Sequence, residues 1–125
     1  MIHFMGLYDE AFQSMKQGDK LYEVRLHDQK RKKLRKGDLI EFTRLPDKKE
    51  TLLVDILNLI PFHTFDQLYQ SVAKEDIAKD NCTHQELLNS TYEIYTKDQE
   101  KQWGVLAIQV AISKQSYALR TIHPQ

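Results

Sequence analysis

Short runs of alternating hydrophobic and polar residues dominate the first half of the chain, and this period of two predicts half-buried strands. The apolar stretch Ile2 to Leu7 predicts a first strand, and Leu21 to Leu26 and Leu39 to Leu45 predict two more. Thr51 to Ile60 is rich in leucine, valine and isoleucine, and it predicts a long, well-buried strand. A last apolar strand is predicted from Trp103 to Ile112.

Helix signals lie between these strands. Apolar residues at helical spacing follow the first strand, and Gly18 stands where the C-terminal glycine of that helix belongs. Thr64 and Thr83 each open a capping-box pattern, in which the hydroxyl accepts a hydrogen bond from a free amide of the helix that follows. Residues 46–49 form a polar turn of the kind that joins a hairpin. The tail from Ser113 to Gln125 is compatible with either packing or fraying.

The predicted order of elements is β-α-β-β-β-α-α-β, without a linker, a repeat or a low-complexity tract. Mostly antiparallel strands with helices to one side predict a small α+β domain, with a sheet that curls toward a barrel. The 125 residues fit one domain, residues 1–125, with a single core. With 41% hydrophobic and 29% charged residues and no apolar stretch of about 18, the composition is that of a soluble globular protein without a membrane span.

The redox and targeting signals predict a cytoplasmic protein. Cys82 is the only cysteine, so no intramolecular disulfide can form. Residues 1–5 lack the basic and apolar regions of a signal peptide. A role for Cys82 as a nucleophile needs a neighbouring base such as His84, and an unreactive thiol is the simpler interpretation.

Charge is unevenly distributed along a chain that is formally neutral, with 18 basic and 18 acidic side chains. Residues 20–36 contain eight basic and two acidic side chains, so this window carries +6 and the remainder carries −6. Such a segment attracts anions locally. The basic run at residues 30–36 has no alternating acids, which favours nucleic-acid binding, and the alternative is a solvated surface face.

Lys20, Glu23 and Arg25 form the strongest candidate site. Glu23 and Arg25 project from the same face of the predicted strand, opposite its apolar face, and Lys20 immediately precedes that strand. A glutamate beside a lysine and an arginine stays ionised and orients the arginine fork. This arrangement can bind a phosphate or a base edge, or can carry out acid–base chemistry if the pKa of the lysine is perturbed. The alternative is an exposed strand face with a weak surface ion pair.

Other side chains give weaker signals. The histidines are scattered without a pair at i,i+4, and there is no phosphate-binding glycine loop, so neither a metal site nor a cofactor is predicted. Several aromatic residues could stack on bases, although most lie at core-compatible spacing, and Phe62 and Tyr69 are the least committed to a core. The candidates are Tyr22, Phe62, Tyr69, Tyr95 and Trp103.

A longer pattern in this region resembles a known family. It consists of Gly-x-Lys-x-x-Glu-x-Arg at residues 18–25, then Lys30-Arg31, and then Gly37-Asp38 before a strand. This pattern resembles the ASCH domain family of the PUA-like superfamily, and in particular its small stand-alone bacterial members. The resemblance covers most of the chain, from His3 through the strand that contains Ile108.

The resemblance implies a β-barrel of five or six strands with helices packed outside. It also implies a cleft that binds RNA or a nucleotide and is lined by the lysine, glutamate and arginine of the motif. The basic run beside the motif is then a flanking electrostatic guide. The implied ligand-binding residues are Lys20, Glu23, Arg25, Lys30, Arg31 and Arg35.

Two further interpretations stay open. The resemblance implies a possible hydrolase, because one bacterial group of the family hydrolyses 4-acetylcytidine with a lysine, a threonine and a glutamate, and another is described as a ribonuclease. Lys20 matches that lysine, Glu23 stands where the group has its threonine and could orient a water as a general base, and Asp80 is the nearest match to the glutamate. The third interpretation is a small-molecule or protein-interaction module that makes no nucleic-acid contact.

Overall fold

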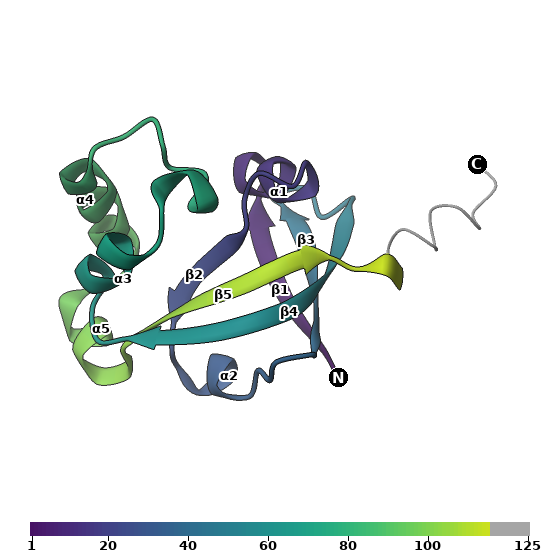
Figure 1. Ribbon diagram of the computed structural model, residues 1–125, viewed down its shortest axis with the longest axis horizontal. Helices are drawn as coiled ribbons and strands as arrows, with labels where there is room; N and C mark the ends of the chain where they lie inside the picture. Colours follow the sequence, from purple (N-terminus) through teal and green to yellow (C-terminus); the bar gives the residue numbers. More distant parts are fainter. Residues whose placement is uncertain (116–125) are drawn as a thin grey trace.

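A computed structural model describes residues 1–115 of the chain, so the tail residues 116–125, including Tyr117, Leu119 and Ile122, lie outside the described residues. Within residues 1–115 the strands form one five-stranded sheet in the order β1-β3-β4-β5-β2, in which only the β1–β3 pair is parallel. The sheet curls into a half-barrel with β1 and β2 at its two edges (Figure 1). The strands are β1 (Ile2–Tyr8), β2 (Tyr22–Leu26), β3 (Leu39–Leu45), β4 (Thr51–Phe62) and β5 (Val105–Ile112).

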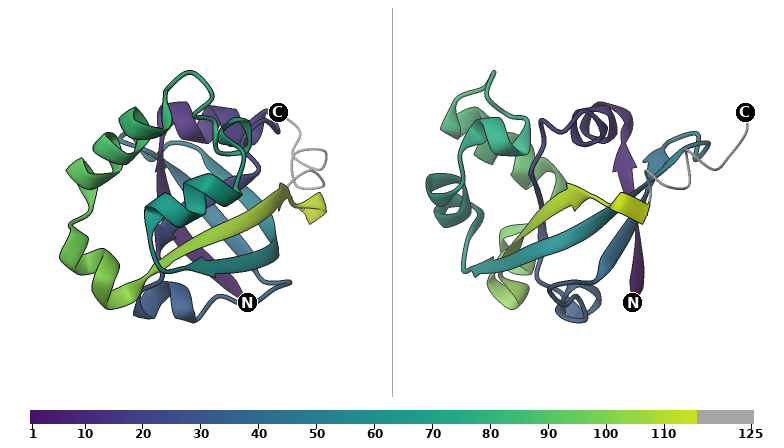
Figure 2. Two further views of the ribbon diagram at one scale, coloured as in Figure 1. Left: turned by 60° about the vertical axis from the view of Figure 1, so that its left-hand side comes forward. Right: turned by 45° about the vertical axis from the view of Figure 1, so that its right-hand side comes forward.

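Helices cover both ends of the half-barrel and one of its sides. Helix α1 and the short helix α2 lie at opposite ends of the half-barrel, and the other helices gather beside β2 and β5 (Figure 2). No helix within residues 1–115 is long and apolar enough to cross a membrane. The helices are α1 (Asp9–Lys16), α2 (Gln29–Lys32), α3 (Phe65–Ser71), the 3-10 helix η1 (Lys74–Ile77), α4 (His84–Ile94) and α5 (Lys97–Trp103).

Two apolar clusters hold these layers together. The first fills the curled sheet, and Phe12 and Met15 of α1 and Leu34 after α2 close it. The second lies between the outer face of the sheet and the helices α3 and α4. β5 serves both clusters, which explains why its sequence is an almost uninterrupted apolar run. Its residues Leu106, Ile108 and Val110 enter the first cluster, and Val105 and Ala107 enter the second.

The predicted α+β fold, a small barrel of five or six mostly antiparallel strands with flanking helices, is confirmed, with five strands that form a half-barrel. The hairpin turn at 46–49 and the helix starts at Thr64 and Thr83 are also confirmed. Thr83 forms the complete capping box with Glu86. At Thr64 the hydroxyl accepts from the amide of Gln67, but the Gln67 side chain accepts from the amide of His63 instead.

The predicted strand start at Trp103 is wrong, because Trp103 ends α5. This helix begins with its own capping box, in which the Thr96 hydroxyl accepts from the amide of Gln99 at 3.0 Å. Gly104 then ends the helix with a φ of 70°, a backbone conformation that favours glycine. A Cβ at Gly104 would lie 3.0 Å from the carbonyl oxygen of Phe62, which also excludes a larger residue.

Candidate functional site

The opening of the half-barrel forms a cleft of about 500 Å³ between the edge strands β1 and β2. Lys20, Glu23 and Arg25 supply charged groups to its lining. Apolar and aromatic side chains from β1, β3, α3 and α4 supply most of the remaining wall. They include Leu7, Tyr8, Leu45, Phe65, Tyr69, Leu87, Ile94 and Tyr95.

The register of β2 determines which face carries the charged residues. Glu23 pairs with Ile108 of β5, and Ile108 packs inside the curled sheet. Because paired residues on adjacent antiparallel strands share a face, Glu23 also points to the inside, where only 6% of it is exposed. Tyr22 and Val24 pack on the opposite face, against the second apolar cluster. The charged face is therefore neither exposed to solvent nor part of the apolar core, and it lies at the open seam of the half-barrel.

The carboxylate of Glu23 binds both neighbouring cations. Its Oε1 lies 3.3 Å from Nζ of Lys20, and its Oε2 accepts a hydrogen bond of 2.6 Å from Nε of Arg25. Lys20 is equally buried, with 6% exposed, and its ammonium also lies 3.4 Å from the carbonyl oxygen of Ile77. Two cations around one carboxylate leave a surplus positive charge at the cleft.

Burial and charge act in opposite directions on these groups. Burial favours a raised pKa for Glu23, but the adjacent Lys20 and Arg25 hold the pKa below its ordinary value. Burial lowers the pKa of Lys20, and the carboxylate of Glu23 offsets part of that effect. Glu23 is therefore ionised at neutral pH and is a weak base, whereas Lys20 is the group whose proton is more easily released than usual.

Arg25 connects the two edges of the sheet. Its Nη2 donates a hydrogen bond of 2.6 Å to the carbonyl oxygen of Gly6 on β1, while its Nε is bound to Glu23. A guanidinium carries five N–H donors, so this side chain retains donors for a ligand. Gly6 itself lies close to β3, because a Cβ at this position would come within 2.6 Å of the Leu45 side chain.

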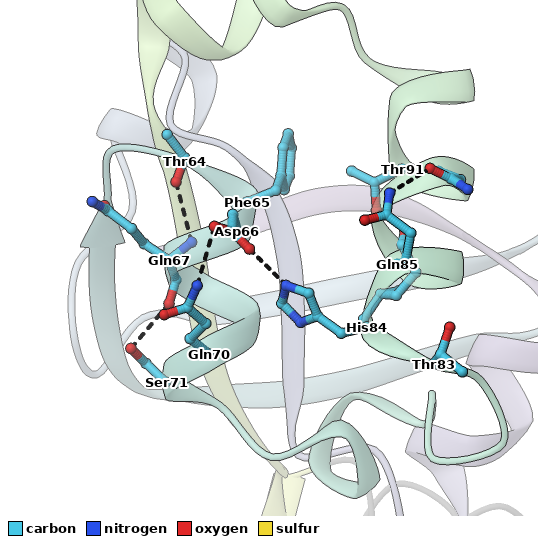
Figure 3. Close-up of polar contacts among 12 residues, drawn as sticks. Thr64, Phe65, Asp66, Gln67, Gln70, Ser71, Thr83, His84, Gln85 and Thr91 are labelled. Carbon is cyan, nitrogen blue, oxygen red and sulfur yellow. Dashed lines mark hydrogen bonds and ion pairs between the residues drawn. The ribbon is translucent and has the colours of Figure 1, made fainter.

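Two polar contacts hold α3 against α4, which together form one wall of the cleft. Asp66 Oδ1 of α3 lies 2.6 Å from Nε2 of His84 in α4 (Figure 3), and this hydrogen bond lowers the pKa of Asp66. The Tyr69 hydroxyl lies 2.8 Å from Oγ1 of Thr91, and burial raises the pKa of Tyr69 to about 12. These two contacts between side chains therefore fix α3 against α4, and with them the wall of the cleft.

Of the predicted ligand-binding residues, the structure brings together Lys20, Glu23 and Arg25. Arg31 is held by Asp28, with Nη1 at 3.0 Å from Oδ2. Lys30 is exposed, its pKa is lowered by partial burial and by the charges of Arg31 and Arg25, and it is not among the residues that line the cleft.

The structure separates Arg35 and Asp80 from this cluster. Arg35 donates to the backbone carbonyls of Lys32 and Leu34, and it is not among the residues that line the cleft. Asp80 is exposed in the turn after η1 and also lies outside the cleft lining. The arrangement therefore does not place Asp80 with Lys20 and Glu23.

The remaining candidate residues lie in different parts of the structure. Cys82 Sγ donates to the backbone carbonyl of Lys79, and its neighbour His84 is engaged by Asp66. Tyr69 and Tyr95 line the cleft, whereas Phe62 and Trp103 line a separate pocket. Within residues 1–115, no three side chains of His, Cys, Asp or Glu come together in a way that could hold a metal ion.

Sequence reasoning missed the contribution of α4 to the cleft. Leu87, Thr91 and Ile94 recur at helical spacing after the Thr83 cap, and this face of the helix lines the cleft. Ile94 is 74% exposed there, which is unusual for a large apolar side chain. Helical periodicity predicts that this face is apolar, but only the fold shows that it borders a cleft in addition to packing Leu87 into the second apolar cluster.

The sequence model of the ASCH domain family matches residues 5–113, and the chain therefore belongs to this family. The fold is also similar to solved structures. The crystal structure of the hypothetical protein PH0355 is 27% identical, with a TM-score of 0.81 over 90% of this chain and 100% of that one. The solution structure of protein PF0455 from Pyrococcus furiosus is 26% identical, with a TM-score of 0.73 over 91% of this chain and 99% of that one.

A third solved structure has a similar fold and a more distant sequence. The crystal structure of the ASCH domain from Lactobacillus crispatus JV V101 is 11% identical, with a TM-score of 0.62 over 88% of this chain and 79% of that one. At this level of identity the likeness shows a shared fold. No curated protein matches the chain.

Proposed function

We propose that this protein binds RNA or a nucleotide in the cleft between β1 and β2. The observation that carries the proposal is the buried cluster of Lys20, Glu23 and Arg25, which places a surplus positive charge at the base of an aromatic-walled cleft. That charge complements a phosphate or the carbonyl oxygens of a base. Membership of the ASCH domain family, whose domains generally bind RNA, supports the same class of ligand.

The shape of the cleft restricts the form of the ligand. A volume of about 500 Å³ suits one nucleoside or nucleotide, and an intact duplex does not enter a space of this size. The phenol ring of Tyr95 lines the cleft, and an aromatic ring can stack on a base for about 1–3 kcal/mol. We therefore propose that the ligand is a free nucleotide or an unpaired nucleotide of single-stranded RNA.

Binding of labelled single-stranded RNA at increasing salt, followed by fluorescence anisotropy, tests this proposal. Affinity is expected to fall steeply with salt, and Lys20→Met is expected to weaken binding by about tenfold or more, because it removes the surplus charge. Lys16→Met is the matched control, since Lys16 pairs with Glu50 and does not line the cleft. Equal affinity in the two variants, with melting temperatures showing both to be folded, would remove the support for this site.

A specific observation also supports a second candidate, hydrolysis of a modified nucleoside such as 4-acetylcytidine, or of RNA. A lysine with a lowered pKa inside a cleft is a candidate acid–base group. The experiment incubates 4-acetylcytidine and RNA oligomers with the wild type, Lys20→Ala and Glu23→Gln. Product that appears only with the wild type supports hydrolysis. Absence of product, or product at equal rates in all three, rules it out for these substrates.

A further inference from the structure

A second pocket, of about 690 Å³, lies where α5 and β5 meet the end of β4. It shares no lining residue with the cleft. Two aromatic residues, Phe62 and Trp103, contribute to its lining, together with His27, His63 and Lys101. Trp103 is only partly buried against the second apolar cluster, so part of its surface is available to a ligand.

Helix α2 brings positive charge to this pocket. Nζ of Lys32 lies 5.6 Å from the centre of the Trp103 ring, and Lys33 beside it is exposed. Glu100 also lines the pocket, and it accepts from two neutral donors, the amide of Phe65 at 2.7 Å and the Tyr92 hydroxyl, so its negative charge remains. Lys101 in the lining, with Lys32 and Lys33 beside it, outnumbers this one carboxylate, and Asp28 is paired with Arg31. The surroundings of Trp103 are therefore complementary to an anion that carries an aromatic ring.

The same helix connects the pocket to the cleft. Arg25 of β2 lines the cleft, and His27, two residues later, lines the pocket, so the two sites meet at the end of β2. Helix α2 follows at once and carries Lys30, which is exposed, and Lys32, which lies over Trp103. Helix α2 is thus a basic turn beside the junction of the two sites, and its lysines can contact a phosphate backbone that passes from one site to the other.

We propose that the pocket at Trp103 binds a second base of the single-stranded RNA whose first nucleotide occupies the cleft, with the lysines of α2 contacting the phosphates between them. This inference rests on the proposed function. It adds that the ligand has at least two nucleotides and that its backbone runs from the cleft past α2 to the pocket. A free mononucleotide fills the cleft alone, and an oligonucleotide fills both sites.

A base can replace Lys32 as the group that contacts the Trp103 ring. An exposed cation–π contact such as that of Lys32 contributes less than a base stacked on an aromatic ring. A base can therefore displace the flexible lysine from the ring, and the ammonium then moves to a phosphate. Burial, then Lys32, lowers the pKa of His27, so at neutral pH its uncharged ring can donate or accept one hydrogen bond at a base edge.

Trp103 is the only tryptophan, so its fluorescence reports on this pocket without a label. The experiment titrates the full chain with an RNA hexanucleotide and, separately, with uridine monophosphate, and it follows anisotropy of the labelled hexanucleotide in parallel. Quenching of Trp103 is expected with the hexanucleotide and not with uridine monophosphate. Lys32→Gln is expected to weaken hexanucleotide binding about threefold and to reduce the salt slope by about 1, because one phosphate contact is lost.

Lys48→Gln is the matched control, since Lys48 is exposed in the turn between β3 and β4 and is expected to leave binding unchanged. Hexanucleotide binding without quenching of Trp103 and without an effect of Lys32→Gln would overturn the inference while leaving the proposed function intact. Absence of hexanucleotide binding would overturn the inference, and absence of binding of both the hexanucleotide and uridine monophosphate would overturn the proposed function as well. Quenching of Trp103 in Lys20→Met with the same hexanucleotide affinity as the wild type would support the pocket and contradict the proposed role of the cleft.

Discussion

Arg25 donates a hydrogen bond of 2.6 Å from its guanidinium to the backbone carbonyl of Gly6, and this contact joins the two edges of an open half-barrel. An edge strand presents backbone groups that lack a partner strand, and Arg25 satisfies one of them. The same side chain is held by Glu23 and lines the cleft. One arginine therefore contributes both to the closure of the fold and to the charge of the site.

We predict that Arg25→Lys destabilises the protein by about 1–3 kcal/mol, because a lysine ammonium cannot reproduce both the contact with Glu23 and the contact with Gly6. The measurement is the free energy of unfolding in urea. Arg44→Lys is the control, since the acids that Arg44 contacts, Asp9, Asp47 and Glu50, are all solvent-accessible, and it is expected to cost less than about 1 kcal/mol. Equal losses in the two variants would mean that Arg25 does not join the sheet edges.

We predict a larger loss for Glu23→Ala, because the substitution leaves the buried ammonium of Lys20 without its counter-charge. Removing one partner of a buried ion pair costs about 3–5 kcal/mol. Glu50→Ala removes the partner of Lys16 in a half-exposed pair and is expected to cost about 1 kcal/mol or less. Thermal or urea unfolding of both variants tests the prediction, and a Glu23→Ala variant as stable as Glu50→Ala would refute it.

The lowered pKa of Glu23 predicts how the free energy of unfolding depends on pH. Because the folded-state pKa lies below the ordinary value, the ionised carboxylate stabilises the fold above that ordinary value, and this stabilisation is lost as pH falls through the folded-state pKa. The difference in unfolding free energy between the wild type and Glu23→Gln is therefore expected to be largest near neutral pH and to shrink toward about pH 3. A difference that stays constant over this range would show that the Glu23 charge does not stabilise the fold.

The hydroxyl of Tyr69 provides a test of the α3–α4 wall. Tyr69→Phe removes its bond to Thr91, whose own hydroxyl keeps a bond of 2.8 Å to the carbonyl of Leu87, so no buried group is left unpaired. The expected loss is about 0.5–1.5 kcal/mol in urea unfolding. Tyr8→Phe is the control, because Tyr8 is 69% exposed, and its expected effect is close to zero. A loss no greater than that of the control would indicate that this bond does not hold the wall.

Local patterns predicted the β2 face that carries Glu23 and Arg25, because a period of two places both on one side whatever the fold. They could not predict its burial, since that depends on β2 being an edge strand at the open seam. The prediction at Trp103 failed for a different reason. The apolar residues that follow Trp103 predicted a strand, whereas the Thr96 capping box and Gly104 mark the start and the end of a helix that contains it. Asp80 is matched to the family's glutamate by sequence resemblance alone, and its position in an exposed turn depends on tertiary structure.

Mapping amide chemical shifts by nuclear magnetic resonance during a titration with uridine monophosphate tests the central claim most directly. The account predicts that the largest changes occur at Gly6, at residues 20–25 and along the cleft face of α4 around Ile94. Changes confined to the outer face of β3 and β4, with the amides of Glu23 and Arg25 unmoved at saturation, would contradict it.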